Sequence, residues 1–322
     1  MRSSHLSSLS TPYNRAHHRF AVFTAWCTFL LIIVGALVTS NDAGLSVPDW
    51  PTSFHHWPIT YGYFAVPLVG GVKWEHGHRI LAQFIGLLTI VLALWTQRVD
   101  RRSWMRKLGW AALALVIAQG ILGGITVLHL LPPSVSSAHA ALAQTFFCLV
   151  VAMALFTGRG WVQERGMRLT TRRPALPRLT LLAVAAVYVQ LILGAAFRHH
   201  GIKLLPHLIS AAFVTVILLW TVVRVFRDYP RVEQLRRPAI TLLWLLMLQL
   251  ALGASAWLTR MAWSDDTAKL QTTMVVTTVA HVAVGALLLA NAVVLSLQAW
   301  RNVAIGVRAG KAAPETPKAI AV

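Results

Sequence analysis

Eight apolar runs constrain this chain more than any other feature, because each is close to the roughly 20 residues that a helix needs to cross a bilayer. A soluble domain carries about 25% charged residues, whereas this chain has 12% charged and 57% hydrophobic residues. We therefore predict an all-α, polytopic membrane protein with eight transmembrane helices. The runs cover residues 20–39, 75–97, 107–128, 138–157, 178–197, 204–225, 237–258 and 274–299.

The formal net charge of +19 does not indicate a nucleic-acid partner, because the basic residues lie in the segments between the apolar runs. Most of them fall on one side of the predicted membrane, in the N-terminal tail and in every second loop. Since basic loops stay on the cytoplasmic side, both termini are predicted to be cytoplasmic, in a bacterial plasma (inner) membrane. Residues 40–73 then form the longest loop on the outer side.

The run pattern predicts two pseudo-symmetric four-helix bundles. The outer loop is rich in aromatic residues and proline. Such a loop fits either a lid over a site or a belt of aromatic residues at the membrane surface. The predicted domains are a cytoplasmic tail (1–19), an N-terminal bundle with the outer loop 40–73 (20–157), a cytoplasmic linker (158–177), a C-terminal bundle (178–299) and a second cytoplasmic tail (300–322).

A repeat links four successive pairs of apolar runs. The second run of each pair carries a histidine near its outer end, and a small residue follows four positions later, one turn inward on the same face. The first run carries a glycine in its outer half, preceded four residues earlier by glutamine in three pairs and by Leu31 in the first. The histidines are His78, His139, His207 and His281; the glycines are Gly35, Gly123, Gly194 and Gly253; the glutamines are Gln119, Gln190 and Gln249.

Four histidines at equivalent places in a repeat are hard to explain as packing residues. Neutral imidazole is the commonest metal ligand, and two imidazoles on facing helices can bind heme iron from both sides. The repeat therefore predicts two porphyrin sites, one in each half. Zinc fits less well, because it requires a closed tetrahedral set of ligands that a pairwise repeat does not provide.

The two halves differ in one carboxylate. Glu75 precedes His78 by three residues, which places both on one helical face, and the other three histidines have no such acid. A carboxylate in apolar surroundings suits proton transfer, whereas two histidines without an acid suit an electron-transfer heme. We expect His76, His129, His199 and His200 to be solvated or interfacial. The outer cations Arg198, Lys203 and Arg260, with Arg79 in the first half, are candidate partners for heme propionates.

These residues resemble the heme A synthase family over roughly residues 20–299. The most specific pieces are in the outer loop and at the start of the second run. They are Gly44-Leu45-Ser46, Pro48-Asp49-Trp50-Pro51 and Glu75-x-x-His78-Arg79, together with Gly35 to Thr39 and the later histidines.

The resemblance implies oxidation of the C8 methyl group of heme o to a formyl group, which gives heme a for terminal oxidases. It implies that heme o comes from a heme o synthase, a farnesyltransferase, and that an electron donor takes part. By position, His207 and His281 would ligate a resident heme b, and His78 and His139 would flank the substrate heme. Glu75 would be the catalytic acid.

One departure from the family pattern stands out, and two other readings remain open. Many bacterial members carry a cysteine pair in the first outer loop, but residues 40–73 contain no cysteine. A di-heme b electron-transfer protein would explain the four histidines equally well, but not Glu75. A transporter or heme chaperone fits less well, because broken helices at mid-membrane would be expected and the apolar runs are continuous.

Overall fold

The computed structural model describes residues 13–163, 168–170, 173–261 and 268–305. Eight of its helices are long and apolar enough to cross a membrane, so the predicted all-α membrane fold is confirmed. Each predicted apolar run lies inside one of them. These helices are α1 (Arg15–Ser40), α3 (Val72–Val99), α4 (Ser103–Leu128), α5 (Pro133–Thr157), α7 (Leu176–Arg198), α8 (Leu204–Asp228), α9 (Glu233–Met261) and α10 (Ala268–Asn302).

Local sequence signals explain several helix starts. The side chain of Asn14 accepts a hydrogen bond from the backbone N–H of His17 and caps α1. Helix α5 begins with Pro133, and α7 has Pro177 in its first turn, where a missing N–H costs nothing. The helices extend beyond the apolar runs because their polar ends continue the same backbone hydrogen bonding.

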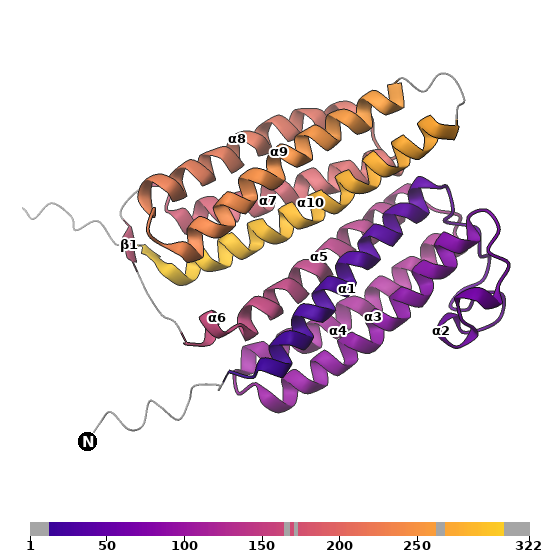
Figure 1. Cartoon of the computed structure of the whole chain (residues 1–322), viewed down its shortest axis with the longest axis horizontal. Helices are drawn as coiled ribbons and strands as arrows, with labels where there is room; N and C mark the ends of the chain where they lie inside the picture. Colours follow the sequence, from indigo (N-terminus) through magenta and orange to yellow (C-terminus); the bar gives the residue numbers. More distant parts are fainter. Residues whose placement is uncertain (1–12, 164–167, 171–172, 262–267, 306–322) are drawn as a thin grey trace, which may run out of the picture.

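The long helices form two groups of four (Figure 1). In the first helix group, α1, α3, α4 and α5 pack in a ring in which α1 also contacts α5. In the second helix group, α7, α8, α9 and α10 pack in the same way, and α10 contacts α7. The predicted pseudo-symmetry between the halves and the predicted domain limits stay predictions.

The two helix groups meet through α1 and α5 on one side and α7 and α10 on the other. Phe29, Phe147, Ala286 and Ala290 form an apolar cluster across this seam. The ring of Phe29 stacks on that of Phe147, with ring centroids 5.9 Å apart. Small and flat side chains therefore let the two helix groups pack closely at this seam.

Outward-facing side chains are apolar on both groups. Trp26, Phe213 and Trp244 are among the large hydrophobic residues exposed on the helix surfaces. An exposed apolar surface of this extent would aggregate in water, but it is the expected lipid-facing surface of a membrane protein.

Shorter elements complete the fold. The outer loop contains the one-turn helix α2 (Pro58–Tyr61) and the 3-10 turn η2 (Tyr63–Ala65). The predicted linker contains α6 (Arg159–Gln163) and strand β1 (Arg168–Thr170), which pairs in parallel with β2 (Val303–Ile305). Helix and strand in the linker were not predicted, because segments of three to five residues carry no usable hydrophobic period.

Candidate functional site

Each histidine of the repeat packs against the glycine of the preceding helix. A Cβ atom added to Gly35 would lie 3.1 Å from Cε1 of His78, and one on Gly123 would lie 3.1 Å from Cε1 of His139. In the second helix group, the corresponding distances are 2.9 Å for Gly194 and His207 and 3.0 Å for Gly253 and His281. The glycines thus leave the space that the imidazoles occupy, which is the physical reason for this part of the repeat.

His207 and His281 face one another across the second helix group. Their ring centroids are 6.4 Å apart and their planes are inclined by 77°. Two imidazoles that bind one iron from opposite faces, each about 2 Å away, have ring centres about 6 Å apart. Within the described ranges, the buried Nδ1 atom of His281 has no hydrogen-bond partner. The spacing of this pair is close to that value, and heme binding by His207 and His281 stays a prediction.

His78 and His139 occupy the equivalent places in the first helix group and are close enough to interact electrostatically. The buried Nδ1 atoms of both rings have no hydrogen-bond partner among the described residues. The described part of the chain also contains no cluster of three or more His, Cys, Asp or Glu side chains able to hold a metal ion. The preference for a porphyrin, which needs one imidazole on each face, over tetrahedral zinc stays a prediction.

Glu75 lies one turn before His78 on α3 and is 4% exposed. Its Oε1 atom is 2.6 Å from Nη2 of Arg79, and its Oε2 atom accepts a hydrogen bond of 2.8 Å from the backbone N–H of Val47. Both carboxylate oxygens are therefore held, so the side chain has a fixed position near the predicted substrate site.

Arg79 connects α3 to the outer loop. Besides Glu75, its terminal nitrogens donate to the backbone oxygens of Val47 at 2.9 Å, Thr52 at 2.5 Å and Asp49. The two terminal nitrogens carry four N–H groups, and these four oxygens match that number. The geometry thus directs the guanidinium toward the loop, and the predicted role of Arg79 in heme binding stays a prediction.

Asp49 fixes the same loop from within. Its carboxylate accepts hydrogen bonds from the Thr52 hydroxyl at 2.5 Å and from the backbone N–H groups of Phe54 and His55 at 2.7 and 2.9 Å. Partial burial raises the pKa of Asp49, but the hydrogen bonds to its charged form outweigh burial and lower the pKa to about 2. Asp49 therefore remains an anion over the whole physiological pH range.

The outer loop packs on the outer end of the first helix group. Its Val47 is fully buried, and Trp50 lies against Gly124 of α4, where an added Cβ would approach the indole to 2.4 Å. The loop is therefore seated on the end of the group where Glu75 and His78 lie. This arrangement favours the lid over the alternative of a loose interfacial belt.

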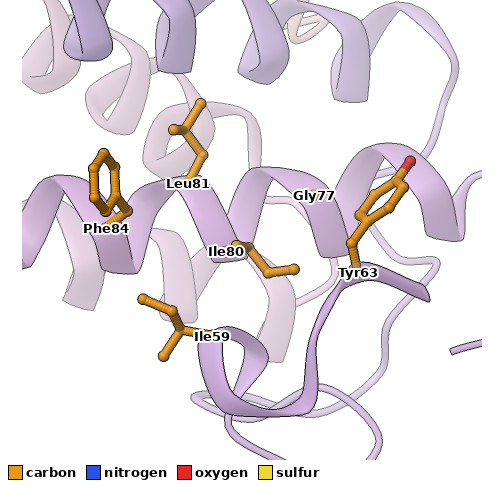
Figure 2. Close-up of a pocket in the computed structure, with 6 residues that line it drawn as sticks. All are labelled: Ile59, Tyr63, Gly77, Ile80, Leu81 and Phe84. Carbon is orange, nitrogen blue, oxygen red and sulfur yellow. The ribbon is translucent and has the colours of Figure 1, made fainter. Parts of the chain in front are cut away.

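A small apolar cavity lies between the outer loop and α3 (Figure 2). Its volume is about 410 Å³, and its lining comes from Ile59 and Tyr63 of the loop and from one face of α3. The α3 residues are Gly77, Ile80, Leu81 and Phe84, and the first of them directly precedes His78 in the sequence. A cavity of this size and lining accepts an aliphatic chain.

The predicted propionate partners differ in their surroundings. Arg198, at the end of α7, donates to the backbone oxygen of Ala36 at 3.1 Å and to Oγ of Ser40 at 2.6 Å. Arg260 lies over the ring of Phe197, and Lys203 is the residue directly before α8. All three lie at helix ends on the side of the histidines, and their roles stay predictions.

The expectation for His76 was wrong. The side chain is fully buried, its Nε2 atom lies 3.1 Å from the backbone oxygen of Gly62, and its ring is parallel to that of Tyr63. His129 and His200 are exposed and His199 is half-buried, in keeping with their expected interfacial position. The loop that covers His76 is contributed from outside the helix, and no helical periodicity reveals such a contact.

Fold and site together define a class: a multi-pass helical membrane protein in which each helix group carries a pair of histidines near one end. The comparisons agree with this class. The family model described as "Cytochrome oxidase assembly protein" matches residues 71–205, a stretch that includes Glu75, His78 and His139.

The chain is also similar to several bacterial heme A synthases. The chain is 28% identical over 255 residues to the heme A synthase of Symbiobacterium thermophilum, which covers 70% of this chain and 80% of the relative. It is 29% identical over 217 residues to the heme A synthase of Bradyrhizobium diazoefficiens, and the match covers 59% of each chain. It is 32% identical over 140 residues to the heme A synthase of Roseobacter denitrificans, and this match covers 41% of this chain and 35% of the relative. The chain is therefore similar to these heme A synthases.

Proposed function

We propose that this chain is a heme A synthase, a membrane oxidoreductase that oxidises the C8 methyl group of heme o to a formyl group. The observation that carries the proposal is the position of Glu75, a buried carboxylate held in place one turn before His78. An electron carrier has no use for such a group, whereas substrate oxidation requires proton transfer close to the reacting carbon.

The residues divide between the two helix groups. His78 and His139 flank heme o, and Glu75 is the catalytic acid. His207 and His281 are the axial ligands of a resident heme b, which when bound supplies one-electron transfer. Arg198, Lys203 and Arg260 are the candidate partners of propionate groups. Arg79 and Asp49 hold the lid that keeps water from the substrate site, since exclusion of water strengthens polar interactions inside it.

The cavity beside α3 is our candidate for the apolar chain of heme o. That chain is the product of a farnesyltransferase, so it is a branched hydrocarbon that needs an apolar surface. Ile80 and Phe84 provide such a surface on the helix that carries His78. This position lets the substrate be distinguished from heme b by its chain rather than by its macrocycle.

The cellular setting follows from the same proposal. The protein lies in the bacterial inner membrane with both termini in the cytoplasm, and the active site is near the outer surface. It receives heme o from a heme o synthase, takes electrons from a separate donor, and supplies heme a for terminal oxidase assembly.

Extraction of hemes from cells tests the activity. The chain is expressed with a heme o synthase in a host that makes no heme a, and the extracted hemes are separated by chromatography. We expect heme a from the wild type and none from Glu75→Ala, while Glu233→Ala, which removes an exposed carboxylate, behaves as the wild type. Undiminished heme a from Glu75→Ala would remove Glu75 from the mechanism. Recovery of heme b alone, whatever the supply of heme o, would favour the di-heme b electron carrier.

A further inference from the structure

Three hairpins of the repeat place a glutamine amide against the histidine that they carry. The amide nitrogen of Gln119 is 3.2 Å from Nε2 of His139, and that of Gln249 is 3.3 Å from Nε2 of His281. The remaining glutamine, Gln190, approaches both ring nitrogens of its histidine, at 3.2 and 3.3 Å. In two hairpins the same amide nitrogen also donates to the backbone oxygen of the histidine, at 3.0 Å.

The glutamines leave one atom unused. The Oε1 atoms of Gln119, Gln190 and Gln249 are all buried and have no hydrogen-bond partner in the part of the chain that the structure describes. The Nδ1 atoms of His139 and His281 are buried and likewise have no partner among those described residues. Orphaned acceptors and orphaned donors in the same hairpins are costly in an apolar interior, so a state of the protein in which they pair is expected to be more stable.

Iron binding supplies the reason for such pairing. A histidine that binds a metal through one ring nitrogen carries a proton on the other, and this N–H almost always donates to a nearby acceptor. The oxygen and nitrogen of an amide are about 2.2 Å apart, as their bond lengths require. An amide whose nitrogen touches the ring therefore needs only a change of side-chain torsion for its oxygen to reach a ring N–H.

We propose that Gln119, Gln190 and Gln249 are positioning residues, each of which accepts the ring N–H of the iron-bound histidine in its own hairpin. The inference rests on the proposed function, because it assumes heme at these histidines. The glycine four residues after each glutamine lets the imidazole approach the helix, and the amide then fixes the orientation of the ring.

The first hairpin lacks this device, since Leu31 takes the place of the glutamine. Leu31 packs in the apolar core of the first helix group and offers no side-chain acceptor, and no described residue is a hydrogen-bond partner of the buried Nδ1 atom of His78. Three of the four histidines are thus held by an amide, and the one beside Glu75 is not. His78 is therefore the ligand that releases most readily, which suits a site where a heme must enter and leave.

The resident heme b offers a readout that does not depend on activity. An acceptor for the ring N–H makes the imidazole more basic and stabilises oxidised iron, so its removal raises the reduction potential. For Gln190→Leu and Gln249→Leu we expect the preference for oxidised iron to fall about tenfold, which is about 59 mV for a one-electron couple. Gln190→Glu and Gln249→Glu keep an acceptor and are expected at or below the wild-type potential. Gln298→Leu, at the other end of α10, is the matched control.

If the glutamines had a role in packing alone, the Leu and Glu variants would not be expected to shift the reduction potential of heme b in opposite directions. Equal potentials in wild type and Leu variants, with heme b retained, would overturn the proposal and indicate a backbone acceptor. If a Leu variant fails to accumulate, the Glu variant and a Gln→Met variant at the same site provide the comparison. Purified wild type without heme b would instead contradict the proposed function itself.

The gain-of-acceptor variant Leu31→Gln tests the first hairpin. We expect it to slow the release of heme o from the purified protein about tenfold or more. The release is measured as the transfer of heme o to excess apomyoglobin. Leu115→Gln, which also introduces an amide into the core of the first helix group, is the control for packing. Equal release rates for wild type and Leu31→Gln would show that the missing glutamine does not set heme exchange.

Discussion

Nη2 of Arg79 lies 2.6 Å from Oε1 of Glu75, one helical turn away, and the same guanidinium donates to three backbone oxygens of the outer loop. One side chain thus holds both the proposed catalytic acid and the lid above it.

Replacement of Arg79 is expected to release the lid. Arg79→Lys keeps the charge but loses the planar fork that reaches four oxygens, and Arg79→Ala leaves Glu75 buried without its charge partner. Removal of one partner from a buried pair costs about 3–5 kcal/mol. We expect faster protease cleavage within residues 41–71 and loss of heme a formation in both variants. The exposed Arg98→Ala, at the other end of α3, should match the wild type; an unchanged cleavage rate in Arg79→Ala would contradict this role.

The fit between glycine and imidazole predicts a contrast within one helix. Gly123→Ala brings a Cβ to 3.1 Å from His139, whereas a Cβ on Gly120 meets no atom within 4 Å. Overpacking of this kind costs about 1–3 kcal/mol, while Gly→Ala at an open helical position gains about 0.5–1 kcal/mol. Thermal unfolding in detergent should place Gly123→Ala below the wild type and Gly120→Ala at or above it. Equal midpoints would show that the glycine is not needed for the ring.

The second helix group allows the same test with a spectroscopic readout. A Cβ on Gly194 would lie 2.9 Å from Cε1 of His207 and displace the ring from its partner His281. We expect Gly194→Ala to lose the absorbance of low-spin heme b, and Gly86→Ala, where an added Cβ meets nothing within 4 Å, to retain it. Full heme b content in Gly194→Ala would contradict the proposal that His207 is a ligand of heme b.

Asp49 sets the pH range over which the lid stays in place. Its pKa is lowered from 3.8 to about 2 in the folded loop, so the unfolded loop binds the proton first as the pH falls. The stabilisation is complete above about pH 4 and disappears as the pH falls through 2. Pepsin cleavage within residues 41–71 should accelerate only below about pH 4 in the wild type. Asp49→Asn removes the charge, and its cleavage rate should be high and unchanged over this range.

The apolar cavity predicts a selective effect on substrate. Ile80→Trp fills part of the cavity, so we expect the KM for heme o to rise about tenfold or more while kcat changes little. The exposed Ile90→Trp, on the lipid-facing surface of the same helix, is the control. Weaker binding of heme b to the same degree as heme o would show that the cavity does not receive the chain.

Periodicity and charge in the sequence were enough to predict the eight helices, because lipid leaves a spanning segment few alternatives to a helix. The sequence also showed that the four histidines and glycines recur at equivalent places, whereas the packing of each imidazole against its glycine became visible only in the structure. These contacts are local to a hairpin, and a hairpin keeps its register.

The contacts of the outer loop could not be predicted from periodicity. The hydrogen bonds from Arg79 to Val47 and Thr52, and the burial of His76 beneath Tyr63, join residues with no common period. Irregular backbone of this kind is determined by the sum of its specific hydrogen bonds. The motif Pro48-Asp49-Trp50-Pro51 was a useful sign that the loop is specific, but it did not reveal which oxygens Arg79 would bind.

Arg198 extends from the second half of the chain to the backbone oxygen of Ala36, the neighbour of the glycine that seats His78. A lesion at Arg198 therefore alters the first half as well as its own. A defect caused by a substitution at Arg198 therefore cannot be assigned to one half of the chain alone.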